Sequence, residues 1–308
     1  MKTTTRKDLI EIDSLSVDEI LTICESAKEF KEIFTTSAKK LPTLAGKTVV
    51  CLFIEPSTRT RLSFELAAKR LSADVINIAA SASSLVKGES LIDTVITLEA
   101  MNADYVVMRH PVSLAPNFLS RHCKASVING GDGNHAHPTQ ALLDAYSIIE
   151  KKGSLKGLHI GIIGDIKHSR VARSDIEIFI KLGAKVTLCG PPTLLPEEFL
   201  SFGCSISYDF DKLLPELDVV NMLRIQLERQ KGSVFPSIRE YVKYFALTED
   251  RMKICRPDII VMHPGPINRG VEIEDSVADC KNSIISEQVT NGIAVRMGVF
   301  TLLSGNEV

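Results

Sequence analysis

Short apolar runs alternate with helical patterns along the chain from residue 48 to residue 262. Many of the runs are rich in valine and isoleucine on both faces, as is typical of parallel strands that are covered by helices. This alternation predicts an α/β fold with doubly wound parallel sheets. We expect strands at residues 48–54, 74–78, 104–108, 125–129, 159–163, 185–189, 218–223 and 258–262.

A polar, glycine-containing segment, KKGSLKG at residues 151–157, lies near the midpoint and indicates a domain boundary. We therefore expect two doubly wound domains of similar size, 1–150 and 151–286, with about four strands each. The active site is expected in the cleft between them, as ligands of open α/β sheets lie beyond the strand ends. The last helical pattern, at about residues 287–305, is expected to pack back on the first domain.

Local patterns also predict helices between the strands, two of which can be placed by their residues. One begins near Ser16, which forms a capping box with Glu19. The other follows the segment STRTR, and its apolar positions Leu62, Leu66 and Leu71 suit a stripe that faces the core.

The bulk composition argues against several classes of protein. The chain has 308 residues and a net charge of −2, so it offers no global basic field for nucleic acid. No apolar run approaches the roughly 18 residues that cross a bilayer, and the N-terminus lacks the apolar stretch of a signal peptide. The seven cysteines are scattered and include no CxxC pair, which favours reduced thiols and a cytoplasmic location.

The stretch EPSTRTRLSFE gathers hydrogen-bond donors where the first predicted strand meets a helix. A helix N-terminus presents free backbone N–H groups and a partial positive charge. Ser57, Thr58 and Thr60 add hydroxyl groups, and Arg59 and Arg61 add guanidinium groups that match phosphate oxygens. The stretch therefore predicts a phosphate site. The alternative is an ordinary helix start, capped by Ser57, with solvated arginines.

The segment STRTRLSFE resembles the carbamoyl-phosphate signature of the aspartate/ornithine carbamoyltransferase family. Further segments match that family in order over nearly the whole chain: SSLVKGESLIDT, MRHP, GDGNHAHPTQALLD, GDIKHSRVARS, LRIQLER and MHPGPINRGVEI. The resemblance implies an enzyme that transfers the carbamoyl group of carbamoyl phosphate to the amine of an amino acid and releases phosphate.

The resemblance also implies which residues hold carbamoyl phosphate. They are Ser57, Thr58, Arg59, Thr60, Arg109, His137, Gln140, Gly265 and Pro266. Arg109 ends a strand, where an anion contact is well placed, but a structural ion pair is the alternative. His137 sits at a helix start, which favours a neutral imidazole that donates to the carbonyl oxygen. Gln140 binds either the substrate amine or the phosphate side, and Gly265 and Pro266 offer backbone carbonyl groups to the carbamoyl amine.

The amino-acid substrate is implied to bind Arg170 through its α-carboxylate and Arg224 through its side-chain carboxylate, with Gln226 beside them. Arg224 is a poor partner for the ammonium group of ornithine, so aspartate is favoured. The product is then N-carbamoyl-L-aspartate, and the reaction is an early committed step of pyrimidine (UMP) biosynthesis. Arg173, one turn after Arg170, is taken as a surface or structural residue.

A polar loop around Lys87 is implied to act in the active site of a neighbouring subunit. Lys87 alone would be an ordinary solvated lysine, and either Ser84 or Ser83 supplies the loop serine. The resemblance therefore implies a homotrimer, which regulatory chains or a dihydroorotase can join in a larger assembly. The catalytic set that it implies is Arg59, Thr60, Lys87, Arg109 and His137.

No metal or organic cofactor is expected. His135 and His137 are spaced like a metal pair, but the sequence offers no third ligand nearby and no HExxH motif. Gly161 and Gly164 do not complete a GxGxxG fingerprint, so the sequence does not favour a nucleotide-dependent oxidoreductase. The alternatives that stay open are a transcarbamylase for another amino acid, such as ornithine, and a non-catalytic ligand-binding relative.

Overall fold

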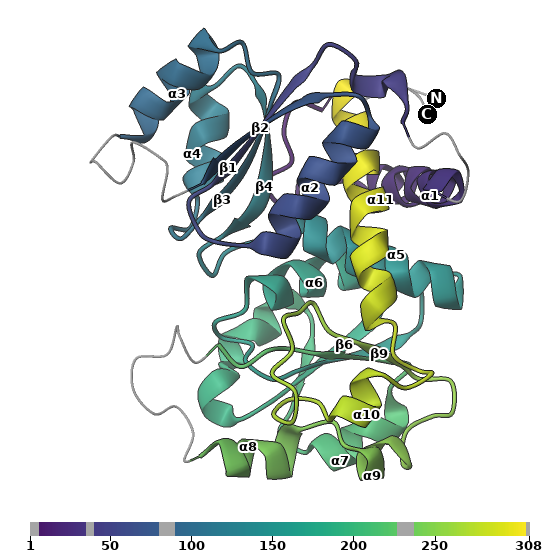
Figure 1. The fold of residues 1–308 in the computed structure, drawn as a ribbon. Coiled ribbons are helices and arrows are strands. Elements are labelled where there is room, and N and C mark those ends of the chain that lie inside the picture. The colour runs from purple at the N-terminus through teal and green to yellow at the C-terminus, as the bar shows by residue number, and fades with distance from the viewer. Residues whose placement is uncertain (1–5, 35–39, 80–89, 227–236, 306–308) are drawn as a thin grey trace. The chain divides into compact units, whose positions relative to one another are not determined.

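The computed structural model describes residues 6–34, 40–79, 90–226 and 237–305 (Figure 1). The chain divides into two compact units. Unit 1 comprises Met1–Leu143 and Thr290–Val308, and unit 2 comprises Asp144–Val289. Each unit contains one parallel sheet with helices on both faces, which confirms the predicted α/β fold class.

Unit 1 is built on a four-stranded parallel sheet in the order β2-β1-β3-β4. The strands are β1 Thr48–Phe53, β2 Asp74–Ala79, β3 Tyr105–His110 and β4 Ser126–Asp132. The helices are α1 Val17–Phe34, α2 Thr58–Arg70, α3 Leu91–Ala100, α4 Ala115–His122 and the first residues of α5 Pro138–Lys152. The C-terminal helix α11 Ile285–Ser304 begins in unit 2, and its residues from Thr290 onward belong to unit 1.

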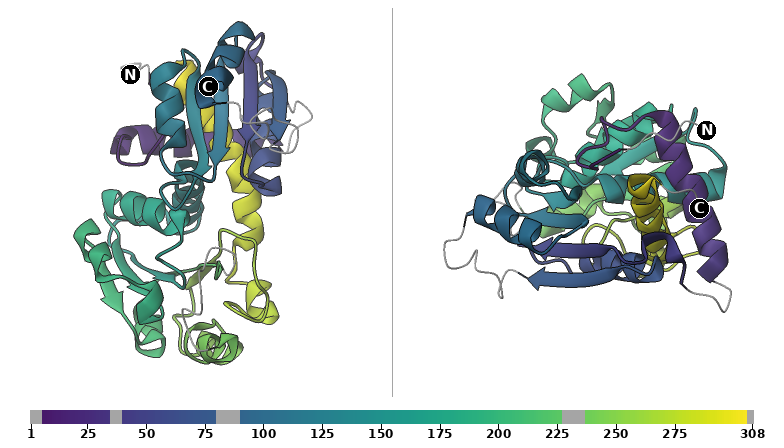
Figure 2. Two further views of the ribbon diagram at one scale, coloured as in Figure 1. Left: turned by 90° about the vertical axis from the view of Figure 1, so that its left-hand side faces the viewer. Right: turned by 90° about the horizontal axis from the view of Figure 1, so that it is seen from above.

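Alternate side chains of the strands in unit 1 pack against different helices, because successive residues of a strand face opposite sides of a sheet. On one face, α3 and α4 pack against β1, β3 and β4. On the other face the ring of Phe300 in α11 lies edge-on to Phe64 of α2, at 6.1 Å, and to Tyr105 of β3, at 5.7 Å. Figure 2 shows α11, in yellow, running beside this sheet.

The expected core stripe of α2 is wrong in part. Leu71 is buried, but Leu62 and Leu66 are 51% and 39% exposed, and the helix instead buries Phe64 with its small neighbours. Positions 62 and 64 are about 200° apart on a helix, so the two stripes cannot both face the sheet. The aromatic side chain has the larger apolar surface to bury, and it packs against Phe300.

Unit 2 is built on a five-stranded parallel sheet in the order β7-β6-β5-β8-β9. The strands are β5 His159–Ile163, β6 Lys185–Cys189, β7 Ser205–Ser207, β8 Val219–Met222 and β9 Ile260–Met262. The helices are α6 Arg170–Lys181, α7 Phe210–Leu213, α8 Ile238–Phe245, α9 Glu249–Met252 and α10 Asp275–Ala278. Short 3-10 helices occur in the two units at Pro42–Leu44, Pro192–Leu194, Glu197–Phe202 and Leu214–Glu216.

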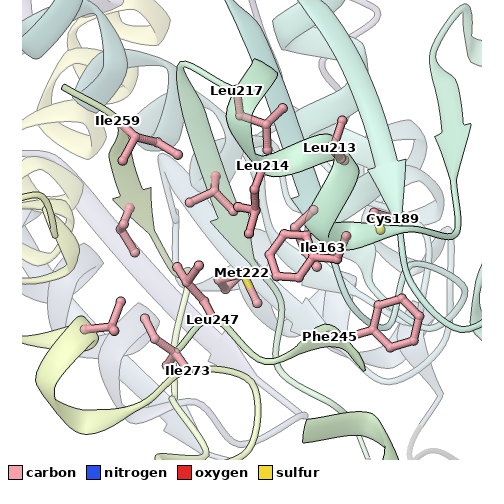
Figure 3. Close-up of a cluster of buried hydrophobic side chains, with 14 of the residues drawn as sticks. Ile163, Cys189, Leu213, Leu214, Leu217, Met222, Phe245, Leu247, Ile259 and Ile273 are labelled. Atoms are coloured by element: carbon pink, nitrogen blue, oxygen red, sulfur yellow. The ribbon is translucent and has the colours of Figure 1, made fainter. Parts of the chain in front are cut away.

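One face of the unit 2 sheet carries a large apolar core (Figure 3). Ile163 of β5 and Met222 of β8 pack there among side chains from α7, α8 and the segments that follow. Asn221 lies between two core residues of β8 and faces the other side, where its amide donates to Asp175 of α6 at 2.8 Å. The edge strand β7 was not predicted, because its three residues, SIS, form no apolar run.

The predicted capping box at the start of α1 is confirmed. The backbone N–H of Ser16 donates to Glu19 Oε2 at 2.8 Å, and the N–H of Glu19 donates to Ser16 Oγ at 3.1 Å. Within the residues that the structure describes, no helix combines the length and the apolar character that a membrane span requires.

Candidate active site

In unit 1 the candidate residues follow three strands that are neighbours in the sheet. Phe53 at the end of β1 pairs with Arg109 of β3, and His110 of β3 pairs with Asp132 at the end of β4. Because the strands are parallel, their carboxyl ends meet at one edge, which is where ligands of open α/β sheets lie. The segment 57–60, Arg109 and the turn that leads to His137 therefore belong to one edge of this sheet.

The first turn of α2 has the donors that an anion requires. Ser57 occupies the N-cap position with extended backbone, φ −160° and ψ 102°, but its side chain makes no capping hydrogen bond. Thr58 and Arg59 are exposed, whereas Thr60 is buried. Ser57 therefore does not form the side-chain cap of the alternative interpretation, and the phosphate site stays a prediction.

Arg109 makes the ion pair that the sequence left open as an alternative. Its Nη2 atom donates to Glu55 Oε1 at 2.6 Å, and Nη1 donates to the carbonyl oxygen of Gly130 at 3.1 Å. The backbone N–H of Ile54 in turn donates to the carbonyl oxygen of Arg109 at 2.9 Å. Glu55 therefore orients Arg109, a role that sequence reasoning missed although this residue stands immediately before the motif.

His137 and Gln140 are both buried at the start of α5. The carbonyl oxygen of His137 accepts from the backbone N–H groups of Gln140, at 3.0 Å, and Ala141, at 3.2 Å. His137 is thus the residue that begins the helix, as its position before Pro138 predicted.

Asp132 organises the turn between β4 and α5. Its carboxylate accepts from the backbone N–H groups of Leu114, at 2.6 Å, and Ala136, at 3.1 Å, and lies 3.0 Å from His135 Nδ1. Burial acts to raise the pKa of Asp132, but the hydrogen bonds from His135 and Asn129 outweigh it and hold the pKa below its usual value. His135 therefore has a structural partner. Within the described ranges, no three His, Cys, Asp or Glu side chains are grouped to hold a metal ion.

In unit 2 the candidate arginines follow the neighbouring strands β5 and β8. Arg170 is the first residue of α6 and is buried, and Ser169 caps that helix by accepting from the N–H of Ala172 at 3.1 Å. Arg224 and Gln226 are half-buried on either side of the buried Ile225.

Gln226 is tied to the turn between β5 and α6. Its Nε2 atom donates to the carbonyl oxygen of His168 at 3.2 Å, and its backbone N–H points to Asp165 Oδ2 at 3.4 Å. The other oxygen of Asp165 lies 2.8 Å from His168 Nδ1. Asp165 thus links the segment of Gln226 to the segment that precedes Arg170, which sequence reasoning also missed.

Gly265 and Pro266 lie in the irregular segment that follows β9. Gly265 has φ +65°, in the left-handed region that glycine adopts without strain. Its N–H donates to His263 Nδ1 at 2.7 Å, and Nε2 of this ring lies 3.1 Å from Glu272 Oε1. A histidine that accepts at Nδ1 carries its proton on Nε2, so His263 is a neutral ring that donates to Glu272.

The structure thus places Ser57, Thr58, Arg59, Thr60, Arg109, His137 and Gln140 in unit 1, and Arg170, Arg224, Gln226, Gly265 and Pro266 in unit 2. Ser83, Ser84 and Lys87 lie outside the described residues. In each unit the candidate residues follow the carboxyl ends of neighbouring strands, and the cationic side chains among them suit anionic ligands.

Two family profiles match the chain. The first, aspartate/ornithine carbamoyltransferase, carbamoyl-P binding domain, matches residues 7–150. The second, aspartate/ornithine carbamoyltransferase, Asp/Orn binding domain, matches residues 156–303.

Individual relatives are similar over nearly their whole length. The aspartate carbamoyltransferase catalytic subunit of Endomicrobium trichonymphae is 55% identical over 297 residues, which cover 96% of this chain and 95% of that protein. The aspartate transcarbamoylase of Trypanosoma cruzi, solved with carbamoyl aspartate and phosphate, has a TM-score of 0.88 at 29% identity and covers 96% and 95% of the two chains. The ornithine carbamoyltransferase of Pyrococcus furiosus has a TM-score of 0.86 at 31% identity and covers 98% of both.

Proposed function

Because the chain belongs to the aspartate/ornithine carbamoyltransferase family, we propose that it transfers the carbamoyl group of carbamoyl phosphate to the amine of L-aspartate. The products are N-carbamoyl-L-aspartate and phosphate, and the reaction is an early step of pyrimidine biosynthesis. The observation that carries this proposal is the gathering of hydroxyl and cationic side chains at the carboxyl ends of β1, β3 and β4.

The first turn of α2 binds the phosphate group of carbamoyl phosphate. Backbone N–H groups at a helix start point outward along the helix axis, and their partial positive charge favours an anion. The hydroxyl groups of Ser57, Thr58 and Thr60 and the guanidinium group of Arg59 add donors at the same place. Lys87 adds a further positive charge.

The carbonyl oxygen of carbamoyl phosphate is held by donors from two segments of unit 1. Arg59 and Thr60 approach from α2, and His137 donates from the start of α5. When the amine attacks, this oxygen becomes negatively charged, so donors aimed at it stabilise the transition state more than the ground state. Arg109, held by Glu55, adds a charge that needs no reorientation during the reaction.

The carbamoyl amine is bound by carbonyl oxygens, because it is a donor. Gly265 and Pro266 supply backbone carbonyl groups, and the amide of Gln140 contributes from α5. The aspartate amine attacks the carbonyl carbon directly, and the leaving phosphate can take the proton from it. The scheme therefore needs no nucleophilic side chain, metal or organic cofactor.

The two carboxylates of aspartate are bound by the arginines of unit 2. Arg170 binds the α-carboxylate, and Arg224, with Gln226 and Lys87, binds the side-chain carboxylate. The hydrogen bond from Gln226 to the turn before α6 supports this assignment, because it ties the segment of Arg224 to that of Arg170.

Ornithine is the alternative amino acid, since the fold is similar to an ornithine carbamoyltransferase as well. Arg224 disfavours it, because a guanidinium group repels the side-chain ammonium of ornithine. The naming of the 55% identical relative also favours aspartate.

A substrate panel of aspartate, ornithine and N-acetylornithine with carbamoyl phosphate tests the choice of amino acid directly. We expect product from aspartate. Faster turnover of either other amine would overturn the substrate assignment, and absence of product from all three would favour a non-catalytic ligand-binding protein.

We further propose a cytoplasmic homotrimer in which Ser84 and Lys87 act in the site of a neighbouring subunit. Chains with Lys87→Ala and chains with Arg59→Ala are each expected to be inactive. Mixed oligomers contain some sites with both residues intact, so subunit exchange should restore part of the activity. If mass spectrometry verifies subunit exchange and no activity is recovered, the proposal of a shared site is contradicted. Whether regulatory chains or a dihydroorotase join the trimer is tested by copurification from the native source.

A further inference from the structure

A connected set of buried polar side chains in unit 2 has no role in the reaction scheme above. It comprises Asp144 of α5, Asp175 of α6, Asn221 of β8 and Gln288 of α11. The first three have no exposed surface, and Gln288 is 4% exposed. Buried polar groups are costly unless hydrogen bonds satisfy them, so such a set calls for an explanation.

The two acids form a carboxyl pair. Asp175 accepts from Asn221 through Oδ2 at 2.8 Å, and the carboxyl group of Asp144 acts on the pKa of Asp175. No N–H or O–H donor of the described chain reaches the buried Asp175 Oδ1. Two carboxyl groups can share a hydrogen bond only if one of them carries a proton. Burial, and then the charge of Asp144, raise the pKa of Asp175 well above its usual value, which agrees with a retained proton.

Gln288 connects this pair to the segment that follows β9. Its Nε2 atom donates to Asp144 Oδ1 at 2.6 Å, and its Oε1 atom accepts from the backbone N–H of His263 at 3.1 Å. Because Asp144 requires a donor, it sets which end of the Gln288 amide faces His263. The ring of His263 in turn accepts from the N–H of Gly265 at 2.7 Å and is braced by Glu272.

We propose that Gln288 is a positioning residue for the carbonyl groups of Gly265 and Pro266, and that Asp144, by accepting from the Gln288 amide, holds it in the required orientation. This inference rests on the proposed function, which assigns these two carbonyl groups to the carbamoyl amine.

The irregular backbone of residues 263–268 explains why side-chain support is needed there. Residues 263–268 belong to no helix or strand, so no regular hydrogen-bond ladder fixes their carbonyl directions. In the described chain, side-chain hydrogen bonds hold the backbone N–H groups of His263, Gly265 and Asn268, the last of which donates to Glu272 at 2.6 Å. Hydrogen bonds weaken steeply outside a narrow range of distance and angle, so a small displacement of this segment would loosen the hold on the carbamoyl amine.

Acetyl phosphate provides the test, because it has a methyl group where carbamoyl phosphate has the amine. Dissociation constants of both compounds are measured by calorimetry on the full-length protein. We expect the wild-type protein to prefer carbamoyl phosphate by roughly tenfold or more, the value of one or two hydrogen bonds. Gln288→Met should remove most of this preference by weakening carbamoyl phosphate alone. A general loss of structure would instead weaken both compounds.

Two further variants keep the test decisive if Gln288→Met does not fold. Gln288→Asn keeps the amide but is too short to reach both partners, so it should also lose the preference. Asp175→Asn is the matched control, since its amide can accept from Asn221 and donate to Asp144 in place of a retained proton. It should keep the preference of the wild-type protein.

The outcomes distinguish a failure of the positioning role of Gln288 from a failure of the proposed function. If the wild-type protein discriminates and Gln288→Asn discriminates equally well, the positioning role is wrong and the proposed function stands. If Asp175→Asn loses the preference as Gln288→Asn does, the arrangement inferred for Asp144 and Asp175 is wrong. If the wild-type protein binds both compounds equally, the contact assigned to Gly265 and Pro266 fails, and the inference fails with it.

Discussion

In unit 1 the proposed ligand-binding side chains belong to strand ends and to the first turns of helices, whereas in unit 2 several of them lie on irregular segments after β8 and β9. Thr58, Arg59 and Thr60 open α2, and Gln140 lies in the first turn of α5. By contrast, Arg224, Gln226 and the pair Gly265 and Pro266 are in no helix or strand.

The means of support differ accordingly. A helix start is fixed by the backbone ladder behind it and by the core on which the helix packs. The segments of unit 2 are fixed by side-chain hydrogen bonds, from Gln226 to His168, from Gln288 to His263 and from His263 to Gly265. We infer that the first turn of α2 depends mainly on the apolar packing behind its helix, and that the segments after β8 and β9 depend on side-chain hydrogen bonds.

The largest effect is expected from breaking the packing of α11 in unit 1. Phe300→Ala removes a ring that contacts both Phe64 and Tyr105, and burial of such a side chain is worth about 3–5 kcal/mol. The free energy of unfolding, measured in urea, should fall by that amount. Val289→Ala on the same helix is the control, because Val289 is 54% exposed and its loss should cost no more than about 0.5 kcal/mol. Equal effects of the two would show that unit 1 does not rest on this packing.

The next effect concerns direct contact with the reacting atoms. Arg59→Ala and His137→Ala should each lower kcat about 10²–10³-fold, as is typical for loss of a donor to a developing oxyanion. Stability should change little for Arg59, which is exposed. Lys69→Ala is the matched control on α2, since Lys69 forms an exposed ion pair with Glu65. Near-normal production of carbamoyl-aspartate by either active-site variant would refute the scheme for unit 1.

Arg224→Ala tests the contribution of unit 2 to substrate choice. Charge-assisted hydrogen bonds are worth about 1.5–3 kcal/mol, so kcat/KM for aspartate should fall by roughly 10–150-fold. The dissociation constant of carbamoyl phosphate should not change. The control is Arg173→Ala, because Arg173 lies over the ring of Phe199, 4.9 Å from its centroid, and has no assigned substrate contact. If Arg224→Ala weakened only the binding of carbamoyl phosphate, the assignment of Arg224 to aspartate would be wrong.

The smallest effect is expected from Asp175→Asn and depends on pH. A carboxyl group whose pKa is raised on folding binds a proton in the native state that it has lost in the unfolded state. Its contribution to stability is therefore full below the unfolded pKa and declines as pH rises toward the folded value, by about 1.4 kcal/mol per unit. Between pH 5 and pH 6, the stability of Asp175→Asn relative to the wild-type protein should therefore rise, by no more than about that amount. A difference that stays constant over this interval would mean that Asp175 does not retain its proton.

Local patterns predicted most of the regular structure. The apolar runs marked eight of the nine strands of the described sheets, and the missed strand β7 is a three-residue edge strand without such a run. The face of α2 was mistaken, because Leu62 and Leu66 fit the helical period as well as Phe64 does. Period alone cannot say which of two stripes meets an aromatic partner more than 200 residues later in the chain.

The candidate ligand-binding residues could be proposed from the sequence because each stands in a compact motif, such as STRTR or HPTQ. The residues that support them could not be proposed in this way. Glu55, Asp132 and Asp165 appear in the sequence as ordinary acidic residues of loops, and their importance is visible only from the side chains and N–H groups that they hold.

The sequence by itself determined the alternation of strands and helices, and with it the parallel α/β architecture, because hydrophobic period is a property of neighbouring residues. It also determined the chemical types of the side chains available to bind anions. Only the tertiary structure decided that Asp144 meets Gln288, which is 144 residues away, and that Asp175 meets Asn221. Such pairs depend on how strands and helices stack within a unit, and no local pattern records the partner of a polar side chain that is buried by a distant part of the chain.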